Sequence, residues 1–270
     1  MRLAASNIAW GPAHDQVMYR TLAELGYRGL EIAPTRIFPE KPYERLEDAS
    51  AFAGRLMSEH GLAVCSMQSI WYGMKQRIFG SPEEREELVR YTVKALGFAK
   101  AVGCTNLVFG NPKNRSLEGH GKARAGIDFF KRIGDLAHEA GLVIALEPNP
   151  AIYGTDFLNT TAETAEYVRE VGNPGLRMNL DFGTFLYNGE GMSVVEENLD
   201  IINHVHISET NLAAIAESPR HLDLARVLKG NGYGGYVSLE MRKQDGEKGL
   251  SEALAYIKRV FGDEEGGSER

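Results

Sequence analysis

Short apolar runs alternate with helical patterns along the whole chain, from Leu3 to Phe261. Each run has the length of a buried strand, and the segment after it carries apolar residues at helical spacing. Strands that alternate with helices form right-handed parallel units. We count eight such units in the 270 residues, which favours a closed (β/α)₈ barrel, an α/β fold, over an open doubly wound sheet. The glycine-rich run at Gly232 to Gly235 is followed by a predicted strand rather than a helix, so it lacks the context of a dinucleotide-binding motif.

The fifth predicted strand shows how such a unit ends. Residues 142–146 are all apolar, as in a strand that is buried on both faces. Glu147 comes next, and Pro148 and Pro150 then prevent further ladder hydrogen bonds. Glu147 is therefore expected where the chain leaves the core, and a charge at that position is costly unless a partner offsets it.

Three later strands also end in an ionisable side chain. Asp181, His206 and Glu240 each lie at the end of a short apolar run, about one strand–helix unit after the previous one. All strand C-termini of a barrel open on one face, and successive strands are neighbours. We therefore expect these three side chains and Glu147 to converge there.

Three carboxylates and one imidazole form a suitable ligand set for a divalent ion. The set favours Mn²⁺, with Mg²⁺, Co²⁺ and Zn²⁺ as alternatives. Without a metal, each carboxylate would instead pair with a neighbouring Lys or Arg, and His206 would be a core histidine. His204, two residues earlier on the same side of the strand, is expected to lie deeper in the barrel. We predict one bound divalent ion, with ligands Glu147, Asp181, His206 and Glu240.

The motifs around these four residues resemble those of a known superfamily. They read Ala-Leu-Glu-Pro-Asn at Glu147, Asn-Leu-Asp-Phe-Gly-Thr at Asp181, His-Val-His-Ile-Ser-Glu at His206 and Ser-Leu-Glu at Glu240. On these motifs the chain resembles the sugar phosphate isomerase/epimerase superfamily with the xylose isomerase-like TIM barrel. That superfamily includes the ketose 3-epimerases and relatives of endonuclease IV. The resemblance spans nearly the whole barrel, but it does not specify the substrate.

The resemblance implies a metal-dependent isomerase or epimerase that acts on a sugar or a sugar phosphate. The metal would chelate a hydroxyl and an adjacent carbonyl of a ketose and stabilise an enediolate. Glu147 and Glu240 would act as acid and base, and Asp181 and His206 would serve mainly as ligands. Two alternatives stay open: a dehydratase of the same superfamily, of the inosose or dehydroshikimate type, and a non-catalytic sugar-binding barrel.

The sequence departs from the superfamily pattern at two places. Many relatives carry a histidine three residues after the strand-six aspartate, where this chain has Thr184. The endonuclease IV relatives hold three zinc ions with extra histidines after strands three and four. Here those positions read Ser66-Met67-Gln68-Ser69 and Phe109-Gly110-Asn111. This difference, together with the net charge of -7, argues against a nucleic-acid partner.

Further polar and aromatic residues at the same predicted face are candidate substrate contacts. Glu31 could accept a sugar hydroxyl, and Trp71 could stack on a sugar ring or simply pack in the core. Lys113 and Arg115 could hold a phosphate or carboxylate, or belong to a solvated loop. His221 could reach the substrate after a long loop. The candidate substrate-binding residues are Glu31, Gln68, Trp71, Lys113, Arg115 and His221.

The remaining predictions concern the chain as a whole. We expect one barrel domain over residues 1–262 and a disordered polar tail over residues 263–270. Cys65 and Cys104 lie in apolar contexts, so we expect free thiols, which fits a cytoplasmic location. We expect no membrane partner, because no apolar stretch approaches the roughly 18 residues of a span, and no signal peptide. Barrels of this kind often pair, so a homo-oligomer stays open.

Overall fold

Eight parallel strands close into a barrel in the order in which they occur along the chain. The computed structural model describes residues 1–117, 123–243 and 248–262, and the predicted tail at 263–270 lies outside these ranges. The predicted (β/α)₈ barrel is confirmed. The strands are β1 (Arg2–Ser6), β2 (Gly29–Ile32), β3 (Ala63–Met67), β4 (Asn106–Phe109), β5 (Val143–Leu146), β6 (Leu176–Asp181), β7 (Ile202–Ile207) and β8 (Tyr236–Leu239).

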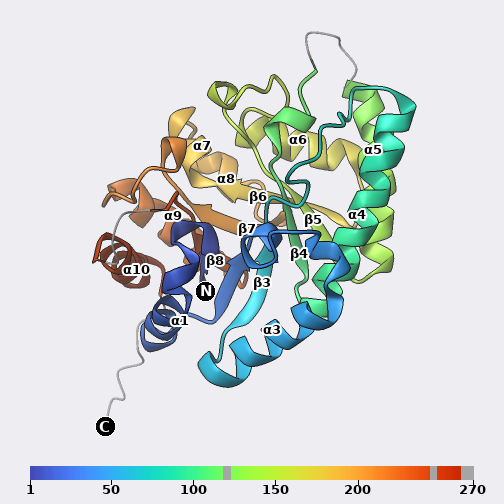
Figure 1. Ribbon diagram of the computed structural model, residues 1–270. Helices are drawn as coiled ribbons and strands as arrows, with labels where there is room; N and C mark the ends of the chain where they lie inside the picture. Colours follow the sequence, from blue (N-terminus) through green and yellow to red (C-terminus); the bar gives the residue numbers. More distant parts are fainter. Residues whose placement is uncertain (118–122, 244–247, 263–270) are drawn as a thin grey trace.

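Helices surround the barrel as an outer ring, as Figure 1 shows. The longest, α4, begins with a capping box between Ser81 and Glu84 and with Pro82 in its first turn. Within the described residues, no helix combines the length and the apolar character that a membrane span needs. The helices are α1 (Asp15–Glu24), α2 (Pro34–Ile37), α3 (Leu46–His60), α4 (Pro82–Val102), α5 (Ala123–Glu139), α6 (Thr161–Val171), α7 (Phe182–Tyr187), α8 (Met192–Glu196), α9 (Pro219–Gly230) and α10 (Lys248–Phe261).

The barrel closes where β1 pairs with β8, with Ala4 opposite Ser238. The interior is tight beside this seam, because a Cβ at Gly29 would lie 2.6 Å from the sulfur of Cys65 and 2.9 Å from the Cβ of Ala4. Cys65 is a buried free thiol, as is Cys104, which confirms that prediction. A side chain larger than that of glycine therefore does not fit at position 29.

An aromatic layer fills the space between the first half of the barrel and its helices. The ring of Trp71 lies 4.6 Å from that of Phe109 and 5.8 Å from that of Phe129, centre to centre and edge to face. Phe130 continues the layer to Tyr167 on α6. Such pairs add to the stabilisation from burial itself, so this layer fixes the loop that follows β3 against α4 and α5.

Candidate active site

The ends of β5 to β8 bring the four predicted ligands into one group. Each of Glu147, Asp181, His206 and Glu240 offers a ligand atom, and these atoms all lie within 4.8 Å of one another. Nδ1 of His206 lies 2.8 Å from Oε1 of Glu147 and 3.2 Å from Oε2 of Glu240. Strand register causes the convergence, since Asp181 pairs with His206 across β6 and β7. Their role as metal ligands stays a prediction.

Asp181 occupies a position that joins the strand to a short helix. It ends β6 and is the N-cap of α7, where its Oδ1 accepts a hydrogen bond from the backbone N–H of Thr184 at 2.6 Å. The hydroxyl of Ser208, just after β7, donates to its Oδ2 at 2.6 Å. Both oxygens of the carboxylate are therefore fixed in direction. Thr184, at the position where many relatives carry histidine, is buried and donates to the carbonyl of Pro148 instead.

Glu147 is fixed by two asparagine side chains that the sequence reasoning missed. Nδ2 of Asn179 donates to Oε1 of Glu147 at 2.7 Å, and Nδ2 of Asn149 donates to Oε2 at 3.2 Å. A signal for these residues exists in the sequence. Asn179 lies two residues before Asp181 on β6, and strand periodicity puts residues i and i+2 on one face. Asn149 follows Glu147 by the same spacing.

Negative charge is in excess in this group. Burial raises the pKa of Glu240 to about 7, with Glu147 and Asp181 adding to the rise and His206 opposing it. Burial and the charge of Glu147 raise the pKa of Asp181, against the hydrogen bonds from Ser208 and Thr184. Two buried carboxylates and the partly buried Glu147 around one imidazole are costly without a compensating charge. A divalent ion would offset that charge, so the residues present fit such an ion.

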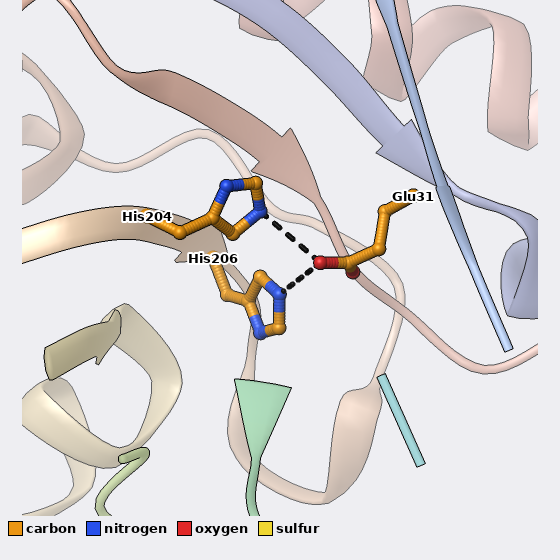
Figure 2. A group of neighbouring side chains, drawn as sticks. All are labelled: Glu31, His204 and His206. Carbon is orange, nitrogen blue, oxygen red and sulfur yellow. Dashed lines mark hydrogen bonds and ion pairs between the residues drawn. The ribbon is translucent and has the colours of Figure 1, made fainter. Parts of the chain in front are cut away.

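Beneath this group lies a second buried cluster, shown in Figure 2, which consists of Glu31, His204 and His206. Oε2 of Glu31 lies 2.9 Å from Nε2 of His206 and 3.1 Å from Nε2 of His204. Nε2 of His204 is close enough to Glu31 for an ion pair, but the angles between the two groups do not allow a hydrogen bond. Burial alone would raise the pKa of Glu31, but the two histidines lower it well below its ordinary value.

A cavity of about 250 Å³ opens above the four converging residues. Three residues of its wall, Ser69, Asn111 and Leu212, have positive φ angles of 53°, 38° and 51°. Non-glycine residues seldom adopt this conformation, and they collect at functional sites. The wall is formed by Gln68, Ser69, Tyr72, Val108, Gly110, Asn111, Pro112, Glu147, Asn149, Tyr153, Asp181, Leu212 and Glu240.

Gln68 is the predicted substrate contact that the structure places on this wall. Trp71 is not such a contact, since its ring is buried in the aromatic layer and its Nε1 donates to Thr92 at 2.9 Å. Of the two interpretations of Trp71, packing in the core is the one that the structure supports. The next residue, Tyr72, is 67% exposed and lines the cavity. The turn at Ser69 sends the two aromatic side chains in different directions, which local sequence does not specify.

Arg115 is also not a phosphate ligand. Its side chain is fully buried, with Nη1 donating to the carbonyl of Glu147 at 2.6 Å and Nη2 to the carbonyl of Leu158 at 3.2 Å. Burial lowers the pKa of Arg115 to about 10. Its neighbour Lys113 is exposed and lies outside the cavity wall. This loop therefore does not form the predicted anion site. Arg115 is instead a structural brace that supports the backbone at Glu147.

Two further predicted contacts lie away from the cavity. His221 is buried in α9, where its Nδ1 lies 3.0 Å from the hydroxyl of Tyr256 on α10, and burial lowers its pKa to about 4. It supports helix packing. Glu31 is fully buried below the cavity wall, so it cannot accept a hydroxyl from a sugar bound there. Both predictions failed because a residue's distance from a strand end does not fix the direction of its side chain.

A sequence profile of the xylose isomerase-like TIM barrel family matches residues 19–260. The chain belongs to that family. The match covers the strands that carry all four converging residues, as well as Glu31. This agrees with the resemblance that the strand-end motifs indicated.

Individual relatives within the family carry the names of sugar-converting enzymes. The *Escherichia coli* (strain K12) protein 3-dehydro-D-guloside 4-epimerase is 23% identical over 96% of this chain and 99% of its own. A human protein named "Putative hydroxypyruvate isomerase" is 30% identical over 62% of this chain. The match spans 64% of that human protein's length.

Solved structures share the fold at lower identity. A crystal structure of 3-keto-D-glucoside 4-epimerase from *E. coli*, in its apo form, superposes with a TM-score of 0.76 at 22% identity over 96% of this chain and 99% of that chain. A D-psicose 3-epimerase crystallised in the presence of D-fructose gives a TM-score of 0.75 at 16% identity, over 97% of this chain and 100% of that chain.

Proposed function

We propose that this protein is a divalent-metal-dependent sugar isomerase or epimerase. The main support is that Glu147, Asp181, His206 and Glu240 converge at one end of the barrel. One ligand atom of each lies within 4.8 Å of those of the others. A divalent ion held by these residues would supply Lewis-acid chemistry, polarising the carbonyl beside the carbon that loses its proton. The donor set favours Mn²⁺, with Mg²⁺, Co²⁺ and Zn²⁺ as alternatives. The buried free thiols support a cytoplasmic location.

Glu147 and Glu240 are the proposed proton carriers. Both approach Nδ1 of His206 while also lining the cavity, so both can face a bound sugar. A carboxylate that faces the substrate can take a proton from carbon and return it. Asn149 and Asn179 hold Glu147 in place. Proton return to the same carbon gives an epimer, and return to the neighbouring carbon gives an isomer.

The wall of the cavity favours binding of a neutral keto sugar, rather than a phosphate group, beside the four converging residues. This wall, as far as the chain is described, contains carboxylates, amides and hydroxyls but neither Lys nor Arg. A second hollow of about 540 Å³ shares Ser69 and Tyr72 with it and has Arg36 and Lys243 in its own wall. Ligand pockets have volumes of about 300–1,000 Å³, so the two together can hold a sugar ring with a substituent. We therefore propose ketoses and keto-glycosides as substrates, with an uncharged part of the sugar at the metal group.

Proton NMR in D₂O tests this proposal. Protein loaded with Mg²⁺ is incubated with free ketoses, ketose phosphates and 3-keto-glycosides, and deuterium entry at carbon is recorded. We expect exchange beside the carbonyl, and the labelled position will separate an epimerase from an isomerase. The matched control is Glu240→Gln, which should show no exchange. Loss of water from the substrate would indicate a dehydratase, and substrate binding without exchange would indicate a non-catalytic barrel.

A further inference from the structure

A buried carboxylate crosses the barrel interior to reach a proposed metal ligand. Glu31 lies on β2 and His206 on β7, and these strands are not neighbours in the closed barrel. Both side chains are fully buried. We infer that Glu31 is a positioning residue, which holds the N–H of His206 on Nε2 and so leaves Nδ1 as the ligand atom for an ion held with Glu147 and Glu240. This inference rests on the proposed metal site and adds a residue that supports it.

The hydrogen bonds of Asn179 favour the same tautomer of His206. Its Nδ2 donates to a carboxylate oxygen of Glu147 at 2.7 Å, which fixes the orientation of the amide group. The same Nδ2 lies 3.1 Å from Nδ1 of His206. An NH₂ group cannot accept a hydrogen bond, so Asn179 does not hold a proton on Nδ1. The carboxylates of Glu147 and Glu240, at 2.8 Å and 3.2 Å, hold one there while no metal is bound. An ion held by the four residues would replace that proton, which leaves the N–H on Nε2, facing Glu31 at 2.9 Å.

Glu31 is itself held from the other side. Nε2 of Gln68 donates to Oε1 of Glu31 at 3.0 Å and to the hydroxyl of Ser6 at 2.7 Å. Oε1 thus faces β3 and β1, while Oε2 faces the two histidines of β7, as Figure 2 shows for the histidines. Carboxylates that accept the second N–H of a ligand histidine fix the ring and raise its basicity as a ligand. Glu31 has the placement for this role.

The same three side chains could instead bind a second ion. Glu31, His204 and His206 offer three buried ligand atoms within 4.8 Å of one another. In that case both histidines would use Nε2 as a ligand atom, and neither could carry a proton there. The two arrangements therefore differ in the number of ions bound and in the proton on Nε2 of His206.

Metal titration of variants separates a positioning role from a general disturbance of the barrel. Calorimetry with Mn²⁺ compares the wild-type protein, Glu31→Gln and the control His204→Asn. His204 contacts the same carboxylate oxygen but lies outside the four-residue metal group. We expect one ion per chain in all three proteins. We expect the Kd to rise about 10- to 100-fold in Glu31→Gln and less than threefold in His204→Asn, roughly the scatter of such measurements.

Nitrogen-15 NMR of histidine-labelled wild-type protein decides the tautomer even if Glu31→Gln does not fold. With the diamagnetic ions Mg²⁺ or Zn²⁺ bound, we expect a proton on Nε2 of His206 and none on Nδ1. In folded Glu31→Gln we expect that Nε2 proton to exchange faster with solvent. Because these signals do not depend on turnover, they report on Glu31 separately from the sugar chemistry.

Three results would overturn the inference. A proton on Nδ1 of His206 in the metal-loaded protein would contradict it directly. Equal weakening of metal binding in Glu31→Gln and His204→Asn would show only a general loss of packing. Two ions in the wild-type protein and one in either variant would make Glu31 a metal ligand. Wild-type protein that binds no ion would instead refute the proposed function, which the calorimetry shows before any variant is compared.

Discussion

The two halves of the barrel end in different chemistry. Strands β5 to β8 end in the charged group of Glu147, Asp181, His206 and Glu240. Strands β1 to β4 present mainly neutral groups to the same cavity, namely Gln68, Ser69, Gly110 and Asn111, with the exposed ring of Tyr72. The second half therefore carries the proposed reaction, while the first half shapes the space for the substrate.

One carboxylate in the first half departs from this division. Glu31 lies on β2, yet it points into the barrel and contacts His206 on β7. The division therefore applies to the residues that face the cavity, and the layer below couples the two halves. The following predictions test the division, beginning with the largest expected effect.

The largest effect is expected for Glu240→Gln in the second half. The amide keeps the volume of the side chain but cannot act as a base, so we expect kcat to fall about 10²- to 10⁴-fold. Deuterium exchange from D₂O into the substrate, with metal at saturation, measures the loss. A Glu240→Gln enzyme with wild-type exchange would remove Glu240 from the proposed mechanism.

A large effect on stability is expected at Arg115, in the loop after β4. Arg115→Met removes both donors to the buried carbonyls of Glu147 and Leu158, so we expect the free energy of unfolding to fall by about 3 kcal/mol. Urea denaturation of the metal-free protein measures it. The control is Lys113→Met, two positions away and exposed, for which we expect a change within about 0.5 kcal/mol. Equal effects would contradict the assignment of Arg115 as a brace.

Metal affinity should depend on pH through the second half of the barrel. The pKa of Glu240 is raised to about 7, so below that pH a proton occupies the carboxylate and competes with the metal. We expect the affinity for Mn²⁺ to fall as pH falls through about 7, by up to tenfold per pH unit. Burial lowers the pKa of His206, but Glu240, Glu31 and Glu147 raise it well above its ordinary value, so loss of the His206 proton adds to the trend. Titrations at several pH values measure this trend. The same slope in Glu240→Gln would show that another group is responsible.

The smallest effect is expected for Tyr72→Ala in the first half. Tyr72 lines both the metal cavity and the second hollow. It forms no hydrogen bond with any of the four converging side chains. We expect KM to rise less than tenfold, in line with the loss of one exposed aromatic contact of about 1 kcal/mol. Steady-state kinetics on a ketose and a keto-glycoside would show a larger rise for the glycoside. A fall in kcat as large as that of Glu240→Gln would break the division.

The sequence predicted the parts of the site that follow from strand periodicity. Glu147, Asp181, His206 and Glu240 come together because each ends a parallel strand of one closed barrel. Asn179 escaped notice although it lies two residues before Asp181 and shares its face. A charged residue at the end of an apolar strand is conspicuous in a sequence, while a neutral amide in a buried strand gives no comparable signal.

Residues on loops and helices were predicted less well. Trp71 packs in the core while Tyr72 reaches the cavity, and Arg115 is buried while Lys113 is exposed. In each pair a local turn decides which neighbour points inward. His221 lies in α9, where packing against α10 decides its surroundings. Such choices depend on the partners that the fold supplies, which sequence spacing does not identify.

Eight strand–helix repeats have few ways to bury their apolar faces, so the barrel and the charged strand ends can be predicted from the sequence. The polar side chains that meet across the interior are known only from the folded structure. Glu31 and His206 are far apart in sequence and lie on strands that are not neighbours, yet their side chains meet at 2.9 Å. The physical reason is that closing the barrel points alternate residues of every strand at a common axis, where a buried charge is stable only beside a partner.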